Sequence, residues 1–318
     1  MHKTMTEFLK SLQLAGKHET ARGYRLGLTQ YDEWLDGDPV SATIDQIKAF
    51  QRYLAQDYLT TKREKLERST QVTRLSAVKA YYAWLTERGL ILIDVARKVK
   101  LPSVPKGPVR KDYLTLQEAI AVLQTQAKRC ERYKKGSYRW AREFRDLTVL
   151  ALMLASGRRR SGMRNLKVGD LNFKRNELRC EWEKGKGGRV LPVADWAMKI
   201  AKLYVDKARP ILDWQGDADW LLVGDRSERM GHETIHQVIR RVHAETVKKN
   251  PDLEDLAQKV ITPHSFRVSF ATMLFSNGCD IRTINELMMH DQLTTTARYT
   301  PIPLEDLQRV CRKAHPRA

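Results

Sequence analysis

The sequence predicts a two-domain protein that is mainly α-helical, with a small β-sheet or hairpin in its second domain. A chain of 318 residues is longer than a typical domain of about 150 residues. Apolar residues recur at helical spacing over the first ninety positions and again over most of the remainder. Residues 176–193 instead alternate apolar and polar side chains, as half-buried strands do.

Residues 1–95 are expected to form a helical domain. Hydroxyl side chains at Thr20, Thr43 and Ser69 precede three apolar stripes and can cap free backbone amides. Gly89 follows the third stripe and provides a helix stop. The stripes contain Tyr24, Leu28, Tyr31 and Leu35, then Ile47, Phe50 and Leu54, and finally Val72, Leu75, Val78, Tyr82 and Leu85.

Residues 96–112 are expected to be a basic interdomain linker. Three prolines oppose helix formation there, and six basic side chains could lie along phosphates. A solvated loop would have the same composition, but the apolar pattern changes on both sides of this segment. The residues concerned are Pro102, Pro105, Pro108, Arg97, Lys98, Lys100, Lys106, Arg110 and Lys111.

Residues 113–318 are expected to form the second domain. Thr115 and Glu118 have the spacing of a capping box at the start of its first helix. A nearly fully buried helix should end near Ala155. The alternating residues 176–193 surround a glycine-rich turn, which predicts a β-hairpin.

The charge balance indicates the class of ligand. The chain has 57 Lys and Arg against 38 Asp and Glu, a net charge of +19. A protein this basic usually binds a polyanion, so nucleic acid is the expected partner. A ribosomal or other nonspecific basic protein would have the same balance, so charge alone does not specify any chemistry.

The apolar content argues against a membrane protein or a secreted one. The longest apolar run, Val149–Ala155, has seven residues, whereas a membrane span needs about 20. The N-terminus lacks the apolar run of a secretory signal, so the chain is expected to stay in the cytosol. The four cysteines contain no CxxC pair and indicate neither a disulfide framework nor a cysteine zinc site. They are Cys130, Cys180, Cys279 and Cys311.

The segment 232–236 matches the HExxH pattern of zinc proteases. On a helix, His232 and His236 would share one face and could bind zinc. No third ligand stands out, and a protease gives no reason for the basic charge. A surface helix that packs through Ile235 explains the segment better.

A second set of residues indicates phosphate chemistry. A buried helix is expected to end at Ser156-Gly157, and three arginines follow it: Arg158, Arg159 and Arg160. An isolated arginine run is usually only a solvated turn. Here further chemically apt residues follow in the chain. They are Lys184 in the hairpin turn, His264 and Arg267 at a helix start, then His290 and Tyr299.

This order of residues resembles the tyrosine recombinase, or phage integrase, family over nearly the whole chain. The family has an arginine after Thr-Gly-x, a hairpin lysine, His-x-x-Arg, a second histidine and a tyrosine. SGRR gives Arg159, KGKGGRVLPV gives Lys184, PHSFR gives His264 and Arg267, MMH gives His290 and ARYT gives Tyr299. The resemblance implies a two-domain DNA clamp, with a core-binding, SAM-like domain at 1–95 and a catalytic domain at 113–318.

The chain departs from the family pattern at several positions. Gly162 stands where the family usually has an acidic residue, so Arg158 or Arg160 could replace Arg159 as the functional arginine. Lys186 is the alternative to Lys184. Val268 follows the second arginine where a histidine is common, and Met288-Met289 replaces the usual Leu-Gly before His290.

The resemblance implies that Tyr299 attacks a DNA phosphate and forms a 3′-phosphotyrosyl bond. Arg159 and Arg267 suit stabilisation of the phosphate charge, because guanidinium stays charged and offers paired donors. His264 would take the phenol proton, Lys184 would protonate the leaving oxygen, and His290 would bind the phosphate. No cofactor and no metal are expected, since these cations supply the positive charge.

The resemblance also implies partners and a setting. The partner is double-stranded DNA, bound by a homotetramer on paired sites, with accessory proteins that bend DNA. The protein would be bacterial or phage-encoded, cytoplasmic, and associated with the nucleoid when bound. Leu304 and Leu307 could belong to a tail helix that docks on a neighbour or on its own domain. The alternatives are a type IB topoisomerase and a noncatalytic DNA-binding member of the family.

Overall fold

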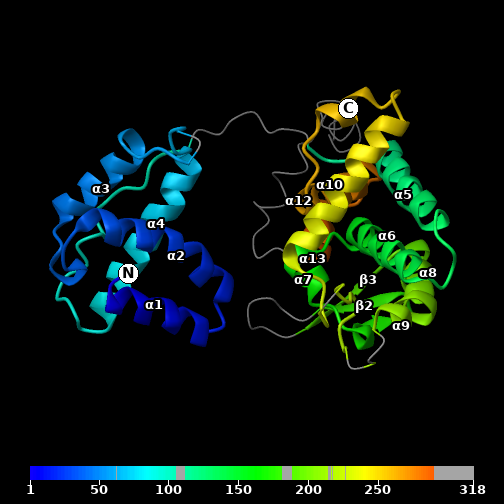
Figure 1. Ribbon diagram of the computed structural model, residues 1–318, viewed down its shortest axis with the longest axis horizontal. Coiled ribbons are helices and arrows are strands. Elements are labelled where there is room, and N and C mark those ends of the chain that lie inside the picture. The colour runs from blue at the N-terminus through cyan, green and yellow to red at the C-terminus, as the bar shows by residue number, and fades with distance from the viewer. Residues whose placement is uncertain are drawn as a thin grey trace, which may run out of the picture. The chain divides into compact units, whose positions relative to one another are not determined.

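The computed structural model consists of two compact units, residues 1–109 and 110–318 (Figure 1). It describes residues 1–61, 63–104, 112–180, 188–213, 216, 218–225 and 227–289. Each unit has its own hydrophobic core. The predicted fold class, mainly helical with a small sheet in the second unit, is confirmed.

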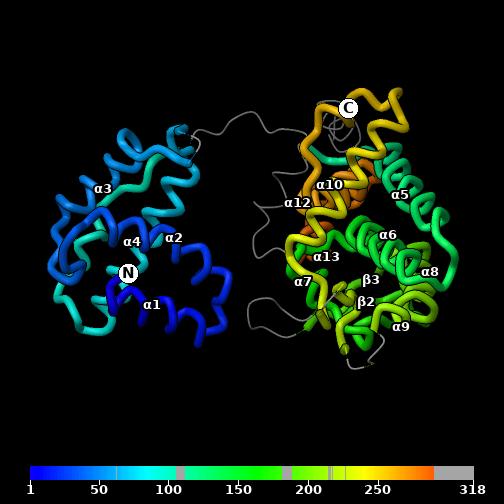
Figure 2. The backbone as a smooth tube through the Cα atoms, viewed as in Figure 1, coloured from blue at the N-terminus to red at the C-terminus, as the bar shows by residue number. Residues whose placement is uncertain are grey.

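The first unit is a helical bundle in which α2 packs along α4, as the tube in Figure 2 also shows. Tyr31 of α2 and Tyr82 of α4 join their hydroxyls at 2.8 Å in the core, where both side chains are fully buried. This pairing satisfies polar atoms that would otherwise be costly to bury. The helices are α1 (Lys3–Leu14), α2 (His18–Leu35), α3 (Ile44–Gln56) and α4 (Arg68–Glu87), with a 3-10 turn at Pro39–Ser41.

The helix starts in this unit agree only in part with the sequence. Thr43 caps α3 as predicted, through a capping box with Gln46. Lys17 precedes α2, and Glu67 precedes α4 without a side-chain cap, so the predicted caps Thr20 and Ser69 lie inside those helices. The predicted stop, Gly89, follows α4 with a φ of 68°.

The chain beyond α4 stays attached to the first unit as far as Val99. Ala96 and Val99 are buried in its core. Lys79 of α4 donates from Nζ to the carbonyls of Ala96, Arg97 and Val99 at 2.6, 3.0 and 2.6 Å. The ammonium group of Lys79 therefore donates to three carbonyls that lie outside the helices.

The second unit is built around α6 (Tyr138–Ser156), which packs against α5, α8 and α12. From Leu147 to Ser156 every residue of α6 is buried, as expected for a core helix. The predicted capping box of Thr115 and Glu118 starts α5. The remaining helices are α5 (Leu116–Glu131), α7 (Arg160–Arg164), α8 (Asp195–Leu203), α9 (Arg209–Leu212), α10 (His232–Lys249), α11 (Glu254–Gln258), α12 (Pro263–Ser276) and α13 (Ile281–Leu287), with a π-helical turn at Tyr204–Ala208.

A small antiparallel sheet completes the described part of the second unit. Strands β2 (Glu177–Cys180) and β3 (Arg189–Pro192) form the predicted hairpin, with Leu178 opposite Leu191. A two-residue strand, β1 (Leu171–Asn172), extends the sheet on the other side of β2. The sequence did not reveal β1, because two residues carry no alternating pattern. Among the described helices none has both the length and the apolar character needed to cross a bilayer.

Candidate active site

The predicted arginine turn begins where α6 ends, at Gly157. This residue has a φ of 58°, in the left-handed region that favours glycine. A Cβ at this position would lie 2.4 Å from Cδ1 of Phe270 on α12. Backbone conformation and close helix contact therefore both require glycine here, and they fix the direction in which the next residues leave α6.

The turn sends its three arginines into different environments. Arg158 is buried, and its Nη1 lies 3.4 Å from Sδ of Met289. Arg160 starts α7 and forms an ion pair with Glu233, with a separation of 3.7 Å. Arg159 precedes α7 and is exposed. Of the three arginines, Arg158 is buried, Arg160 is partly exposed and Arg159 is exposed.

Helix α12 carries the predicted His-x-x-Arg pair. Thr262 and Ser265 form a capping box around Pro263 at the first helical position, so the sequence itself determines the helix start. His264 is the second residue of α12 and is exposed, whereas Arg267 is only 4% exposed.

Arg267 ties α12 to two other segments of the site. Its Nη1 donates to the carbonyl of Gly157 at 2.5 Å, and its Nη2 donates to the carbonyl of Met288 at the end of α13. A single buried guanidinium thus joins the arginine turn, α12 and the last residues before His290. Charge-assisted hydrogen bonds of this kind hold the guanidinium in a fixed orientation.

Three predicted site residues, His264, Arg267 and Arg159, interact electrostatically. Desolvation, followed by the positive charges of Arg267 and Arg159, lowers the pKa of His264 below its ordinary 6.5. Nearby cations disfavour a second positive charge on the imidazole. His264 is therefore neutral at pH 7 and can accept a proton.

The remaining predicted site residues lie outside the described residues. These are Lys184 with its alternative Lys186, His290 and Tyr299. Elements next to these residues in the sequence are described: β3 follows the hairpin turn, and α13 precedes His290. A cavity of about 430 Å³ lies between β3 at the hairpin base and α13, with Arg189 and Glu286 in its lining. The base of the hairpin and the helix that leads toward His290 are therefore neighbours.

The sequence did not identify two residues that shape this site. Phe270 packs against the bare Cα of Gly157, and Ser269 accepts a hydrogen bond from the amide of Leu114 at 2.7 Å. Both lie on α12, directly after His-x-x-Arg. No local pattern distinguishes them from other helix residues, because their partners are 113 and 155 positions away in the sequence.

The HExxH segment does not have the environment of a metal site. His232 begins α10, and its Nε2 lies 3.4 Å from Nη1 of Arg164. Glu233 pairs with Arg160. Cations beside the would-be ligands oppose binding of a metal ion. Within the described residues no three metal-ligating side chains lie together.

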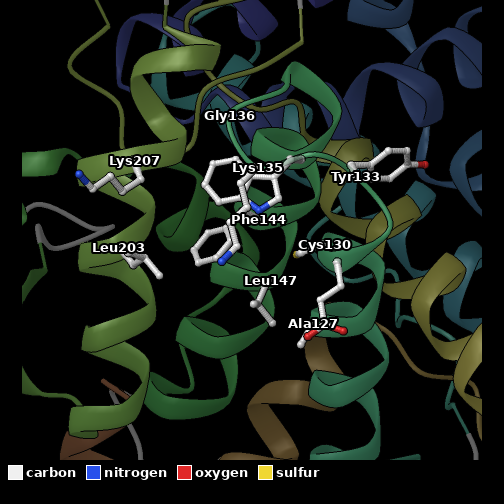
Figure 3. A pocket seen from close by; sticks show the side chains of 11 residues that line it. Ala127, Cys130, Tyr133, Lys135, Gly136, Phe144, Leu147, Leu203 and Lys207 are labelled. Atoms are coloured by element: carbon white, nitrogen blue, oxygen red, sulfur yellow. The ribbon is translucent and has the colours of Figure 1, made fainter.

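An apolar cavity of about 770 Å³ lies away from the predicted site residues, next to α5, α6 and the chain after α8 (Figure 3). Cys130 lines it, along with Trp140 and Phe144. Burial raises the pKa of the Cys130 thiol to about 12, so this cysteine stays protonated at neutral pH. The cavity therefore contains no activated cysteine nucleophile.

Comparison with known proteins matches residues 123–303 to the phage integrase family and residues 5–89 to the N-terminal SAM-like domain of phage integrases. Tyrosine recombinase XerC of Pelobacter propionicus is 30% identical over 287 residues, covering 89% of this chain and 83% of the relative. Tyrosine recombinase XerD of Staphylococcus epidermidis is 25% identical over 321 residues and covers 100% of both chains.

Solved structures show the same fold. The Tn1549 transposon integrase in complex with a circular intermediate DNA has a TM-score of 0.66 at 17% identity, covering 98% of this chain and 100% of that one. XerH recombinase bound to its difH substrate has a TM-score of 0.63 at 14% identity, covering 92% and 78%.

The two helical units, the arginine turn facing His-x-x-Arg and these relatives together define a site-specific DNA recombinase of the tyrosine class. The chain belongs to the phage integrase family, whose match extends over more than half of its length. The relatives favour neither a type IB topoisomerase nor a noncatalytic DNA-binding protein.

Proposed function

We propose that this recombinase cleaves and rejoins duplex DNA through a covalent 3′-phosphotyrosyl bond at Tyr299. The observation that carries the proposal is the grouping of Arg159, His264 and Arg267. These residues come from two segments about a hundred positions apart, yet Arg267 donates to the carbonyl of Gly157, two residues before Arg159, at 2.5 Å. The positive charges of both arginines also lower the pKa of the His264 imidazole, after the larger effect of desolvation. A phosphodiester requires such a combination of fixed cations and a neutral base.

The proposed reaction assigns one task to each residue. The phenol of Tyr299 loses its proton to His264, and its oxygen bonds to the scissile phosphorus. The bond from phosphorus to the 5′ oxygen breaks, and Lys184 gives that oxygen a proton. Arg159, Arg267 and His290 bind the nonbridging oxygens. The phosphotyrosyl bond conserves the free energy of the broken ester, so rejoining needs no ATP.

The exposure, hydrogen bonds and pKa shifts of the described side chains support these roles. Arg159 is exposed where a DNA strand can reach it, whereas Arg267 is buried and anchored to two carbonyls. Burial raises the pKa of Tyr204 in the second unit, which makes that phenol unsuitable as a nucleophile. The proposed mechanism uses neither a metal nor a cofactor.

The two units are proposed to act as the jaws of a DNA clamp. Residues 1–95 would be the core-binding domain, residues 96–112 a basic linker and residues 113–318 the catalytic domain. The net charge of +19 supports this proposal, because phosphate neutralisation dominates DNA affinity. The place of action would be the cytoplasm, at the nucleoid.

A homotetramer on two paired sites is proposed as the working assembly, with DNA-bending proteins as accessory partners. An apolar groove of about 650 Å³ on the second unit supports an interface between copies. Leu116, Ile120 and Trp196 line it and are 63%, 45% and 42% exposed. Leu304 and Leu307 of a neighbouring copy have suitable chemistry to fill it.

The deciding experiment is covalent trapping. The full chain is incubated with nicked duplexes made from the genomic DNA that flanks its gene, and SDS-resistant adducts are resolved on gels. We expect an adduct with the wild-type protein and none with Tyr299→Phe, with or without EDTA. Tyr138→Phe is the matched control, because it removes the hydroxyl of a tyrosine that is 43% exposed and has no assigned role in the reaction.

The other outcomes point to the alternatives. Tight binding to these duplexes without an adduct would support a noncatalytic DNA-binding protein. Relaxation of supercoiled DNA without a specific site would support a type IB topoisomerase activity.

A further inference from the structure

Arg158 is a buried arginine with no carboxylate partner among the residues that the structure describes. The residue is 7% exposed, and its Nε has no hydrogen-bond partner within the described part of the chain. The Nη1 atom of its guanidinium lies 3.4 Å from Sδ of Met289. Burying a charge costs several kcal/mol unless it is compensated, so a residue in this position needs a reason to be charged.

Met289 has a backbone that also needs support. Its φ is 54°, in the left-handed region that side chains with a Cβ seldom adopt. Such a conformation is unfavourable and persists only where the surroundings hold it. The chain has Met288-Met289 at the position where the phage integrase family usually has Leu-Gly. A methionine therefore occupies a place where glycine would be unstrained.

Two arginines hold this strained end of α13. Arg267 donates to the carbonyl of Met288, and Arg158 donates to the thioether of Met289. The amide of Met289 donates to the carbonyl of Glu286 at 3.0 Å. Main chain and side chain at the end of α13 are thus both anchored to the arginine turn and to α12.

We propose that Arg158 and Met289 are a positioning pair that fixes the point at which the chain leaves α13. The next residue in the sequence is His290, and Tyr299 follows nine positions later. The pair thus acts through other residues and does not touch DNA itself. The inference deepens the proposed function and rests on it for the roles of His290 and Tyr299.

The first test uses hydrogen exchange to measure how well the pair stabilises the end of α13, without DNA and without an activity assay. In Arg158→Leu, the amides of Met288 and Met289, which bond to the carbonyls of Ile284 and Glu286, lose one support. We expect their hydrogen exchange to rise by about tenfold or more, while exchange in α5 stays unchanged. Arg139→Leu on α6 is the control, since it removes the same charge from an exposed position. Equal exchange in wild type and Arg158→Leu would overturn the proposal.

The second test measures positioning in the reaction. Arg158→Leu, Met289→Gly and the double variant are compared by the single-turnover rate of adduct formation and by affinity for the same nicked duplex. Each single change should lower the rate by roughly ten- to a hundredfold, with affinity unchanged. The double variant should be no slower than the slower single, because both changes break one pair. Rates that fall additively, or affinity that falls with them, would contradict the pair.

The two tests separate failure of the inference from failure of the proposed function. If the wild-type protein forms no adduct, the recombination chemistry at Tyr299 is wrong, and the exchange measurement still decides whether the pair exists. Arg158→Leu is expected to fold, because it replaces a buried charge, for which the described residues provide no carboxylate, by an apolar side chain of similar size.

Discussion

At the scale of single residues, Gly157 is the position where the site depends most on the absence of a side chain. Gly157→Ala would force a Cβ into the ring of Phe270 and leave alanine in a left-handed conformation. We expect it to lower the free energy of unfolding by about 2–4 kcal/mol, the sum of a backbone term and an overpacking term.

Gly278 is the matched control for this change. It has a φ of 85°, and a Cβ there would meet no atom within 4 Å. Gly278→Ala should therefore lose only the backbone term, about 1 kcal/mol. Urea denaturation of both variants measures the difference. Equal losses would mean that the clash of the new Cβ with Phe270 adds nothing to the loss of stability.

The protonation of His264 provides a second prediction at this scale. The positive charges of Arg159 and Arg267 help to hold the pKa of His264 below 6.5, because they disfavour the imidazolium form. Replacing one charge by a neutral amide, as in Arg159→Gln, removes part of that effect. The pKa should rise toward 6.5, so that the imidazole becomes protonated at a higher pH than in the wild type.

An NMR titration of the His264 imidazole tests this prediction, with Arg139→Gln as a control for simple loss of charge. A midpoint that is unchanged or lower in Arg159→Gln would show that Arg159 does not act on the imidazole. The result would then favour another arginine of the turn as the functional one.

The sequence identified the residue types of this site but not their geometry. His264 and Arg267 could be assigned because Thr262, Pro263 and Ser265 locally determine the start of α12. The sequence favoured Arg159 but left Arg158 and Arg160 open, because the choice depends on the turn at Gly157 and on the contact that turn makes with α12. Long-range packing of this kind leaves no periodic signal in the sequence.

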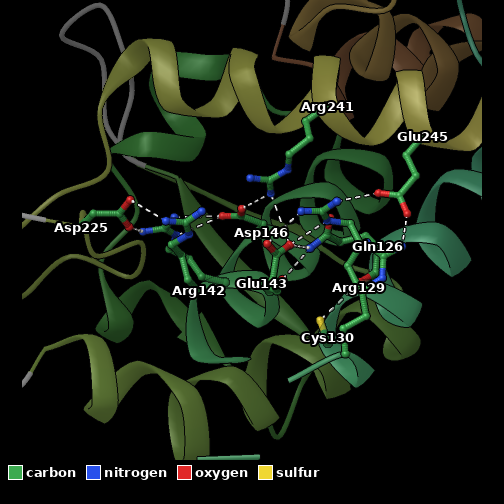
Figure 4. A network of polar contacts seen from close by, with 11 residues as sticks. Gln126, Arg129, Cys130, Arg142, Glu143, Asp146, Asp225, Arg241 and Glu245 are labelled. Atoms are coloured by element: carbon green, nitrogen blue, oxygen red, sulfur yellow. Dashed lines mark hydrogen bonds and ion pairs between the residues drawn. The ribbon is translucent and has the colours of Figure 1, made fainter. Parts of the chain in front are cut away.

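At the scale of secondary-structure elements, a buried ionic network joins α5, α6 and α10 (Figure 4). Glu143 of α6 is 3% exposed and accepts hydrogen bonds from Arg129 at 2.9 and 3.0 Å and from Arg241 at 3.3 Å. Burial alone would raise the pKa of Glu143, but the bonds from Arg129 and Gln126 lower it below its ordinary 4.5. The carboxylate is therefore charged at neutral pH.

Glu143→Ala should be strongly destabilising, because it leaves the charges of Arg129 and Arg241 without one of their partners. We expect a loss of about 3–5 kcal/mol in the free energy of unfolding, as for other broken buried pairs. Asp206→Ala, which breaks an exposed ion pair with Lys202, should lose less than about 1 kcal/mol. Similar losses in the two variants, measured by chemical denaturation, would contradict this view of the network.

Elements with local signals were the ones that the sequence predicted well. The Thr115–Glu118 capping box and the β2–β3 hairpin were both found where expected. Strand β1 was missed because pairing with β2 creates it, not its own two residues. The starts of α2 and α4 were misplaced by three and two residues, because neither start has a side-chain cap.

At the scale of the whole molecule, two separate cores imply that each unit is stable by itself. The first core includes residues up to Val99 and the second starts at Leu114. We expect fragments 1–104 and 112–318 each to show helical circular dichroism and a cooperative unfolding transition. If either fragment is unfolded, the division into two independent units is wrong.

The same division predicts how the chain binds DNA. A tether between two weak binding modules raises their combined affinity by about 10²–10⁴, because the second contact becomes intramolecular. The full chain should therefore bind a nonspecific 30-base-pair probe at least about 100-fold more tightly than either fragment. Each neutralised phosphate steepens the dependence of log K on log salt by about 0.9, so the slope of the full chain should approach the sum of the two fragment slopes.

Fluorescence anisotropy at several salt concentrations measures both the affinity and the salt slope. If one fragment matches the full chain in affinity and slope, the other unit does not hold DNA, and the clamp has to be replaced by a single-domain mode of binding.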